Sequence, residues 1–268
     1  MRSHFYQQEN VARIFWSGGW DSTFRILTLL SETDLAIQPY YVIDPERPSA
    51  AIELETIYFL RDQMQRYLGL DSSRLLPMET IAMDAIPEDA EVDCAHQELR
   101  KHGYVGLQYA WLARFARWQQ LENIELSVER GINIYPHIEG KIERTFHNDG
   151  TNYRLATEAY PEATVFGPFL FPLIMRSSRE IHAEAADRGW DCVLDRTWFC
   201  YRPVAGRYPC GSCRPCVYIM DKKPERYRLP LLGRVRYFAI EKPKRVLPKS
   251  GKTLLKRSIL PFRRRKRS

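Results

Sequence analysis

Residues 11–23, VARIFWSGGWDST, decide the fold. The first six of these residues are mostly apolar, β-branched or aromatic, which predicts a short buried strand. A Ser-Gly-Gly turn follows, and apolar residues at helical spacing then predict a helix over residues 22–31. The order strand, glycine turn, helix places the turn at a helix N-terminus, where backbone amides and the helix dipole favour a bound anion.

The composition of this turn fits a phosphate group. Gly18 and Gly19 let the backbone approach an anion closely, and the hydroxyls of Ser17, Ser22 and Thr23 can donate hydrogen bonds. The turn has neither the Gly-Lys-Ser/Thr of a Walker A loop nor the Gly-x-Gly-x-x-Gly of a dinucleotide fingerprint. The simpler alternative is a glycine turn with Ser22 as the helix N-cap.

Further strands and helices alternate along the chain. We expect strands at residues 36–43, 75–83, 124–128 and 165–173, and helices at 51–68, 107–121 and 179–188. The last helix carries a Ser-x-x-Glu capping box, formed by Ser177 and Glu180. This alternation predicts an α/β fold with a doubly wound, mostly parallel sheet. We interpret residues 141–164 as a long loop or small insertion, because their periodicity is weak.

Four of the six cysteines lie close together in the sequence, as Cys200-x9-Cys210-x2-Cys213-x2-Cys216. Four thiolates at short spacing predict a closed tetrahedral Zn²⁺ site with a structural role. An iron–sulfur cluster and free thiols are the alternatives. Cys94 and Cys192 have no such neighbours, and we expect them to be ordinary buried thiols.

The positive charge is concentrated at the end of the chain. Residues 242–268 carry twelve Lys and Arg and no acidic residue, whereas residues 1–241 carry 28 basic and 33 acidic residues. This basic tail could bind nucleic acid through phosphate contacts, lie on an anionic membrane surface, or be a solvated extension without a partner.

Length and composition bound the remaining possibilities. The chain has 268 residues, of which 44% are hydrophobic and 27% charged, which excludes a wholly disordered protein. No run is long and apolar enough for a membrane span, and no secretory signal is visible, so we expect a cytoplasmic protein. We expect three parts: an α/β domain over residues 1–195, a zinc-binding segment over 196–241, and the tail.

The two motifs together resemble a known family. The strand, Ser-Gly-Gly-x-Asp-Ser turn and helix resemble the PP-loop ATP pyrophosphatases, which implies an adenine-nucleotide α-hydrolase-like sheet. The cysteine segment 196–216 resembles the C-terminal zinc motif of the 7-cyano-7-deazaguanine synthase family of PP-loop proteins. The resemblance runs from about residue 12 to residue 220 in order and spacing.

This resemblance implies an ATP-dependent carbon–nitrogen ligase of the deazapurine (queuosine) pathway. The substrates would be ATP with Mg²⁺, a deazapurine-like small-molecule carboxylate and ammonia, and the product an amide or nitrile. Asp21 and Ser22 would be catalytic. The resemblance implies nucleotide-binding roles for Ser17, Gly18, Gly19, Asp21, Ser22, Thr23, Asp44 and Arg179, and substrate contacts for Glu129, Tyr135 and His137. A homodimer is also possible.

The sequence departs from the family pattern in the half expected to bind the substrate. His137 stands where the family has Asp, with an exposed loop histidine as the simpler interpretation. Ser178 stands where the family has Lys, with Arg176 and Arg179 as neighbours. Two alternatives therefore stay open: a PP-loop sulfur transferase that modifies tRNA, and a non-catalytic nucleotide-binding relative with a nucleic-acid-binding tail.

Overall fold

The chain divides into two compact units. The computed structural model describes residues 10–131, 134–147, 150–156, 158–222 and 228–243. Unit 1 comprises Met1–Trp198 and unit 2 comprises Phe199–Ser268. The boundary expected from the sequence lies three residues earlier, after residue 195. The two units are described separately.

Unit 1 is built on one mixed sheet. In the described part, seven strands follow the order β3-β2-β1-β4-β7-β6-β5. The strands from β3 to β7 run parallel, whereas β6 and β5 run antiparallel at one edge. The strands are β1 (Val11–Phe15), β2 (Ala36–Ile43), β3 (Glu79–Ala82), β4 (Ile124–Glu125), β5 (Ile142–His147), β6 (Gly150–Leu155) and β7 (Phe169–Leu170).

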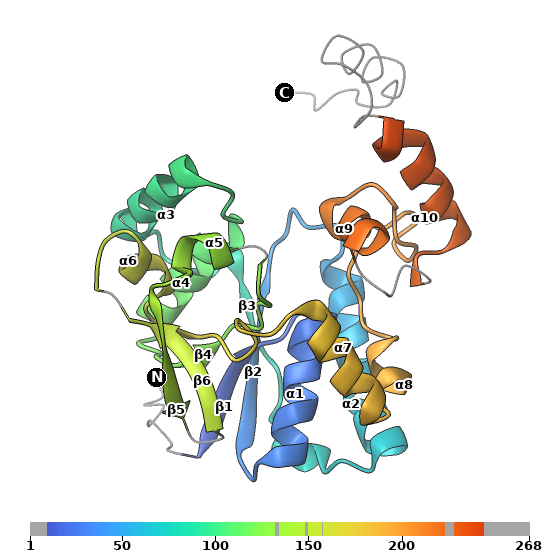
Figure 1. The fold of residues 1–268 in the computed structure, drawn as a ribbon, viewed down its shortest axis with the longest axis horizontal. Coiled ribbons are helices and arrows are strands. Elements are labelled where there is room, and N and C mark those ends of the chain that lie inside the picture. Colours follow the sequence, from blue (N-terminus) through green and yellow to red (C-terminus); the bar gives the residue numbers. More distant parts are fainter. Residues whose placement is uncertain (1–9, 132–133, 148–149, 157, 223–227, 244–268) are drawn as a thin grey trace. The chain divides into compact units, whose positions relative to one another are not determined.

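Helices cover both faces of this sheet (Figure 1). One face packs against α1 (Trp20–Glu32), α2 (Ala50–Leu68), α7 (Ser178–Asp187) and α8 (Asp191–Leu194). The other face packs against α3 (Ala90–His102), α4 (Gln108–Trp118), α5 (Tyr135–Ile138) and α6 (Glu162–Phe166). The fold is therefore a doubly wound α/β fold, as the alternation of strands and helices predicts.

Each face has its own apolar core. Ile14, Phe24 and Leu60 belong to the core beneath α1 and α2, and all three are completely buried. Phe115 and Phe169 belong to the core on the opposite face. Burying each large apolar side chain contributes about 1.5–3 kcal/mol, so these two layers hold the sheet between its helices.

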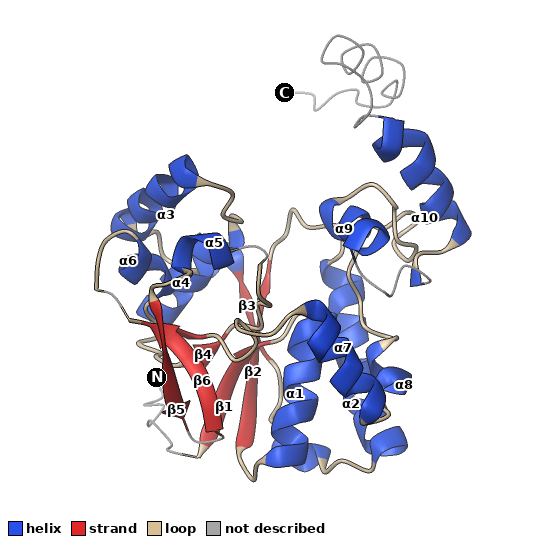
Figure 2. Cartoon of the chain, viewed as in Figure 1, coloured by secondary structure: helices blue, strands red, loops and turns tan. Residues whose placement is uncertain are grey.

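The hairpin β5–β6 corrects one sequence expectation. Residues 141–164 are not a long loop, because β5 and β6 pair antiparallel in register from Ile142↔Leu155 to His147↔Gly150 and α6 follows them. The strand expected at 165–173 is also shorter than predicted, since Val165 and Phe166 end α6 and only Phe169–Leu170 joins the sheet. Figure 2 shows β5 and β6 on one side of the sheet, with β5 as the edge strand.

Unit 2 is small and mostly helical. Its described part contains α9 (Arg214–Lys222), α10 (Leu231–Arg236) and the π-helical turn η4 (Tyr237–Glu241), which continues α10. An isolated antiparallel bridge joins Val204 to Tyr208 ahead of α9. In the residues that the structure describes, no helix is long and apolar enough to cross a lipid bilayer.

Candidate functional site

The sheet of unit 1 has a topological switch point between β1 and β4. From β1 the chain moves outward through β2 to β3, whereas from β4 it moves in the opposite direction to β7. In open α/β sheets, ligands bind in the crevice beyond the carboxyl ends of the strands at such a point. The segment after β1 contains Ser17, Gly18 and Gly19, and the segment after β4 contains Ser127 and Glu129.

The turn after β1 needs glycine at its second position. Gly18 has φ +68°, and a Cβ atom there would lie 3.2 Å from Cγ1 of Ile57 and 3.3 Å from the carbonyl oxygen of Glu53. The turn therefore lies close against α2. The carbonyl oxygen of Gly18 also accepts a hydrogen bond from the amide of Trp198, at 2.9 Å, which fixes the peptide plane of the turn.

The N-terminus of α1 has no side-chain cap. Gly19 is the N-cap, with φ −78° and ψ 166°, and it has no side chain with which to cap the helix. The Thr23 amide is the first to bond within the helix, to Gly19 oxygen at 3.0 Å. The preceding amides of the first turn therefore have no acceptor inside the helix, and together with the dipole of a 13-residue helix they could receive an anion. The alternative with Ser22 as the N-cap is wrong.

The hydroxyl groups of this turn differ in their availability. Thr23 is completely buried, and its Oγ1 accepts a hydrogen bond from the indole Nε1 of Trp16 at 3.0 Å. Ser22 is also buried, and its Oγ donates to Gly19 oxygen at 3.3 Å. Ser17 is exposed. Thr23 therefore holds the turn against the core, and any phosphate contact comes mainly from the backbone and Ser17.

A buried carboxyl group, that of Glu53, lies in α2 next to the turn. Glu53 accepts hydrogen bonds from the hydroxyls of Tyr41 at 2.8 Å and Ser49 at 2.7 Å, and it pairs with Arg47 at 3.0 Å. Burial raises the pKa of Glu53, and Arg47 opposes that shift. Asp44, at the end of β2, accepts a hydrogen bond from the amide of Glu46 at 2.9 Å, so it shapes the β2–α2 turn.

The β4 side of the switch point presents buried oxygen atoms. Glu129 is 1% exposed. The Oγ atoms of Ser127 and Ser178 are buried and have no hydrogen-bond partner among the described residues. Such atoms carry a desolvation cost that a bound polar group would relieve. Ser127 is not among the site residues expected from the sequence, although a serine inside the predicted strand 124–128 is a signal for it.

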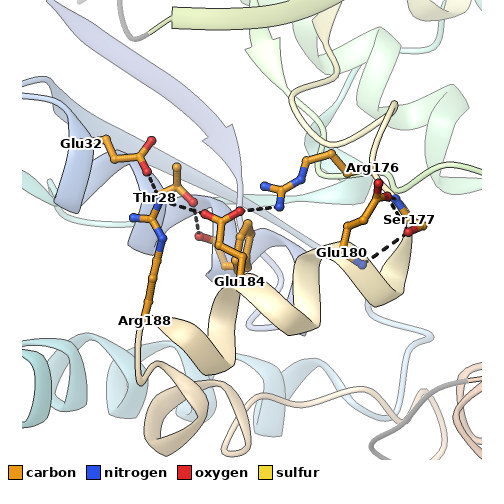
Figure 3. A network of polar contacts seen from close by, with 8 residues as sticks. Thr28, Glu32, Arg176, Ser177, Glu180, Glu184 and Arg188 are labelled. Atoms are coloured by element: carbon orange, nitrogen blue, oxygen red, sulfur yellow. Dashed lines mark hydrogen bonds and ion pairs between the residues drawn. The ribbon is translucent and has the colours of Figure 1, made fainter.

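The arginines near the start of α7 have different surroundings. Arg176 pairs with Glu184 and lies over the ring of Phe24, 5.4 Å from its centre. Arg188 pairs with the same Glu184 at 2.9 Å, so the two arginines reach that carboxylate from two sides (Figure 3). Arg176 therefore ties α7 to α1. Arg179 is exposed, and its side chain shows no hydrogen bond or ion pair within the described residues.

The N-terminus of α7 is already capped. The Ser177 hydroxyl accepts from the amide of Glu180, and the Glu180 carboxylate accepts from the amide of Ser177 at 2.7 Å (Figure 3). This confirms the capping box read from the sequence. Because its own residues satisfy it, this helix end is a poorer anion site than the N-terminus of α1.

The predicted substrate residues lie in two settings. Glu129 lies at the switch point, whereas Tyr135 and His137 belong to the short helix α5. His137 is 9% exposed, so the interpretation as an exposed loop histidine is wrong. Burial lowers the pKa of His137, and a hydrogen bond with the backbone of Tyr104 opposes that shift. A Cβ at Gly103 would lie 3.1 Å from its Nε2, so the ring packs tightly under this loop.

The four clustered cysteines of unit 2 converge on one point. Their sulfur atoms all lie within 4.8 Å of one another, and separations of 3.4, 3.8 and 3.9 Å join Cys213 to Cys216, Cys213 to Cys200 and Cys210 to Cys216. Four thiolates around one Zn²⁺ stand about 3.8 Å apart. In a 4Fe–4S cluster each thiolate binds a different iron, and in a 2Fe–2S cluster the four thiolates are divided between two irons, so in both cases the sulfurs spread further. The spacing therefore fits a single tetrahedral ion.

The backbone directs hydrogen bonds at these sulfurs. The amide of Cys210 donates to the sulfur of Cys200 at 3.2 Å, and the amides of Ser212 and Cys213 donate to the sulfur of Cys210 at 3.4 and 3.2 Å. Contact with Cys200 lowers the pKa of Cys213 to about 7, whereas contacts with the other sulfurs raise that of Cys216. Neighbouring thiolates repel one another, so a bound cation would favour the charged form of all four.

A close approach of two glycines supports this cluster. Gly211 has φ +72°, and a Cβ there would lie 1.8 Å from the carbonyl oxygen of Gly233 in α10. Arg236 donates from Nε to the carbonyl oxygen of Cys210 at 3.0 Å. α10 therefore helps to hold the cysteine loop in place. The spacing of residues in the sequence does not predict this contact between α10 and the loop.

The remaining sequence expectations have mixed outcomes. Cys94 and Cys192 are exposed, so the expectation that they are buried thiols is wrong, since each lies on the outer side of its helix. The basic tail, apart from Lys242 and Pro243, lies outside the described residues.

No protein-family model matches the chain, and a search of curated proteins finds no match either. The proposed function therefore rests on the residues described above.

Proposed function

We propose that the protein is an ATP-dependent ligase that activates a carboxylate as an adenylate and transfers ammonia to it. The observation that carries this proposal is the uncapped N-terminus of α1, behind a Gly18-Gly19 turn at the topological switch point. This arrangement suits a polyphosphate, and the Ser-Gly-Gly-x-Asp-Ser order suits release of pyrophosphate from ATP. The resemblance to the 7-cyano-7-deazaguanine synthases supplies the substrate class, a 7-carboxy-7-deazapurine.

The chemistry follows from the poor reactivity of a carboxylate. A carboxylate oxygen attacks the α-phosphorus of ATP, and the bond to the β-phosphate oxygen breaks to release pyrophosphate. Ammonia then forms a C–N bond and AMP leaves, which gives the amide. A second ATP then adenylates the amide oxygen with release of pyrophosphate, and loss of AMP and of the two amide protons gives the nitrile. The first turn of α1 would hold the pyrophosphate, and a bound Mg²⁺ would offset the negative charge of the phosphates.

The other side of the crevice would orient the carboxylate substrate. Ser127 and Ser178 each offer a hydroxyl without a partner in the described residues, and Glu129 offers a buried carboxyl group. These groups could bind the amino and carbonyl edges of a purine-like ring, because such an edge presents donors and acceptors side by side.

We propose that Cys200, Cys210, Cys213 and Cys216 hold a structural Zn²⁺. All four sulfurs face one another, so a tetrahedral ion bound by them has no open position for a substrate. The zinc would stabilise unit 2 and take no part in the reaction.

One observation favours a second candidate, a nucleotide-binding protein without turnover. Ser178 supplies no positive charge where the family has Lys, and the guanidinium of Arg176 pairs with Glu184. The exposed Arg179 is left as the cation at this helix end. If Arg179 does not reach the phosphates, the protein would bind ATP without cleaving it.

The test is the release of AMP and pyrophosphate from ATP with 7-carboxy-7-deazaguanine and ammonia. We expect AMP release by the wild type and none by Asp21→Ala, which alters the first turn of α1. The matched control is Asp34→Ala, an exposed residue beyond the opposite end of the same helix, which should behave as wild type. ATP binding without AMP release, tried across deazapurine carboxylates, would select the second candidate. Absence of ATP binding would reject both.

A further inference from the structure

The helix formed by α10 and η4 exposes an apolar face. Leu231 and Leu232 are 77% and 50% exposed, and Val235 and Phe238 are also more than half exposed. On a helix these positions, with exposed Ala239, lie on one side. The opposite side carries the buried Gly233 and Tyr237, which face the cysteine loop and α9. The apolar face is thus the outer face of the helix.

Positive charge borders this apolar face. Arg234 and Arg236 lie on its two flanks, since they fall on either side of Val235 in the helical projection. Lys242 lies at its end, with its Nζ 5.2 Å from the centre of the Phe238 ring. The chain then continues for 26 residues that carry eleven Lys and Arg and no acidic residue.

We propose that this face, Leu231, Leu232, Val235 and Phe238, docks unit 2 onto an anionic lipid surface. A helix of this kind lies in the interface with its apolar side chains among the acyl chains and its cations among the headgroups. The basic residues from 242 onward add electrostatic attraction to anionic lipid. A nucleic-acid partner would explain the basic residues, because proteins bind nucleic acid through its phosphates and by stacking aromatic rings on its bases. It would give no role to the three exposed aliphatic side chains of the face.

The experiment is co-sedimentation of the full-length protein with vesicles. The vesicles contain phosphatidylcholine alone or with about a third phosphatidylglycerol, a typical anionic lipid. We expect binding to the anionic vesicles that weakens as salt is raised, and little binding to phosphatidylcholine alone. The variant Leu231→Gln/Val235→Gln/Phe238→Gln should lose at least about tenfold in vesicle binding, because it removes the apolar contact but no charge.

A control variant makes the test specific. Leu107→Gln/Trp118→Gln/Phe146→Gln removes three exposed apolar side chains from unit 1 and should bind vesicles as the wild type does. Bound metal, measured in both variants, reports whether unit 2 has folded.

Three outcomes would overturn the proposal. In the first, the triple variant of the α10–η4 face keeps its metal and binds vesicles as the wild type does. In the second, the wild type does not bind vesicles but forms a concentration-dependent dimer, which this variant abolishes. In the third, the wild type does not bind vesicles but binds RNA, and the RNA binding depends on the face. The first would exclude the face as the lipid contact. The second would assign it to a second copy of the chain, and the third to nucleic acid.

Discussion

The cysteine cluster and the α1 turn differ in the groups that they offer to a ligand. In the cluster, four side chains point at one place and have no other structural role that explains the geometry. At the turn, the hydroxyl of Thr23 is bonded to Trp16 and that of Ser22 to Gly19. The cluster is therefore a side-chain site, whereas the turn is mainly a backbone site. Substitutions should affect them differently.

The largest effect is expected at the cluster. Cys216→Ser should abolish stoichiometric metal binding, because a structural zinc site contributes about 10–16 kcal/mol to folding in zinc-finger peptides. Cys192→Ser, at an exposed cysteine outside the cluster, should keep the wild-type metal content. The measurement is elemental analysis of purified protein. Equal metal content in the two variants would contradict the assignment of the cluster.

The second largest effect, on the free energy of unfolding, is expected at the buried ion pair next to the switch point. Arg25 and Glu125 form a buried two-pronged ion pair, with both bonds at 2.7 Å. Glu125→Ala leaves a buried guanidinium without its carboxylate and should lower the free energy of unfolding by about 3–5 kcal/mol in urea denaturation.

The surface pair of Arg154 and Glu143 is the control for this effect, because both side chains are about half exposed. Glu143→Ala should cost below about 1 kcal/mol. Similar losses of unfolding free energy in Glu125→Ala and Glu143→Ala would show that burial does not make the first ion pair more important for stability.

Gly18→Ala separates the backbone site from simple backbone strain. Alanine at φ +68° costs about 1–2 kcal/mol, and its Cβ would also press on Ile57 and displace the turn. Gly69→Ala carries similar strain at φ +61°, but nothing lies within 4 Å of its Cβ. We expect both variants to lose stability and only Gly18→Ala to lose ATP binding, measured by titration calorimetry. Unchanged ATP affinity in Gly18→Ala would argue against the α1 turn as the nucleotide site.

The smallest effect concerns His137. Burial lowers the pKa of its imidazole, so below about pH 6.5 the unfolded chain takes up a proton more readily than the folded one. This group therefore makes stability fall as the pH falls below that value. His137→Gln should reduce the loss of urea resistance between about pH 7 and pH 5. The exposed His102, replaced in the same way, should change little. A loss of AMP release without any change in this pH dependence would instead make His137 a substrate contact.

Much of the fold could be predicted from local pattern. Strand β2 and helix α2 match their predicted bounds to within a residue, and Gly69 ends α2 in the left-handed region. The hairpin β5–β6 escaped prediction because it is an edge hairpin whose outer strand alternates only weakly between buried and exposed residues. Helix α3 was also missed, since its apolar stripe is narrow and most of its residues are charged or polar.

The cysteine cluster was easier to predict from the sequence than the contacts that support the two candidate sites. Cysteine spacing reveals a metal site because the ligands are side chains close together in the sequence. The role of Gly233 depends on a close approach to Gly211, which only the folded chain reveals. The same holds for Arg176, whose pairing with Glu184, eight residues further along the chain, removes it from the cations expected near the phosphates.

A crystal structure with Mg²⁺ and α,β-methylene ATP, which cannot release pyrophosphate, would test the central claim most directly. Our account predicts that the β- and γ-phosphates lie on the backbone amides of the first turn of α1, against Gly18 and Gly19. A triphosphate bound elsewhere, with that turn facing only solvent, would contradict it.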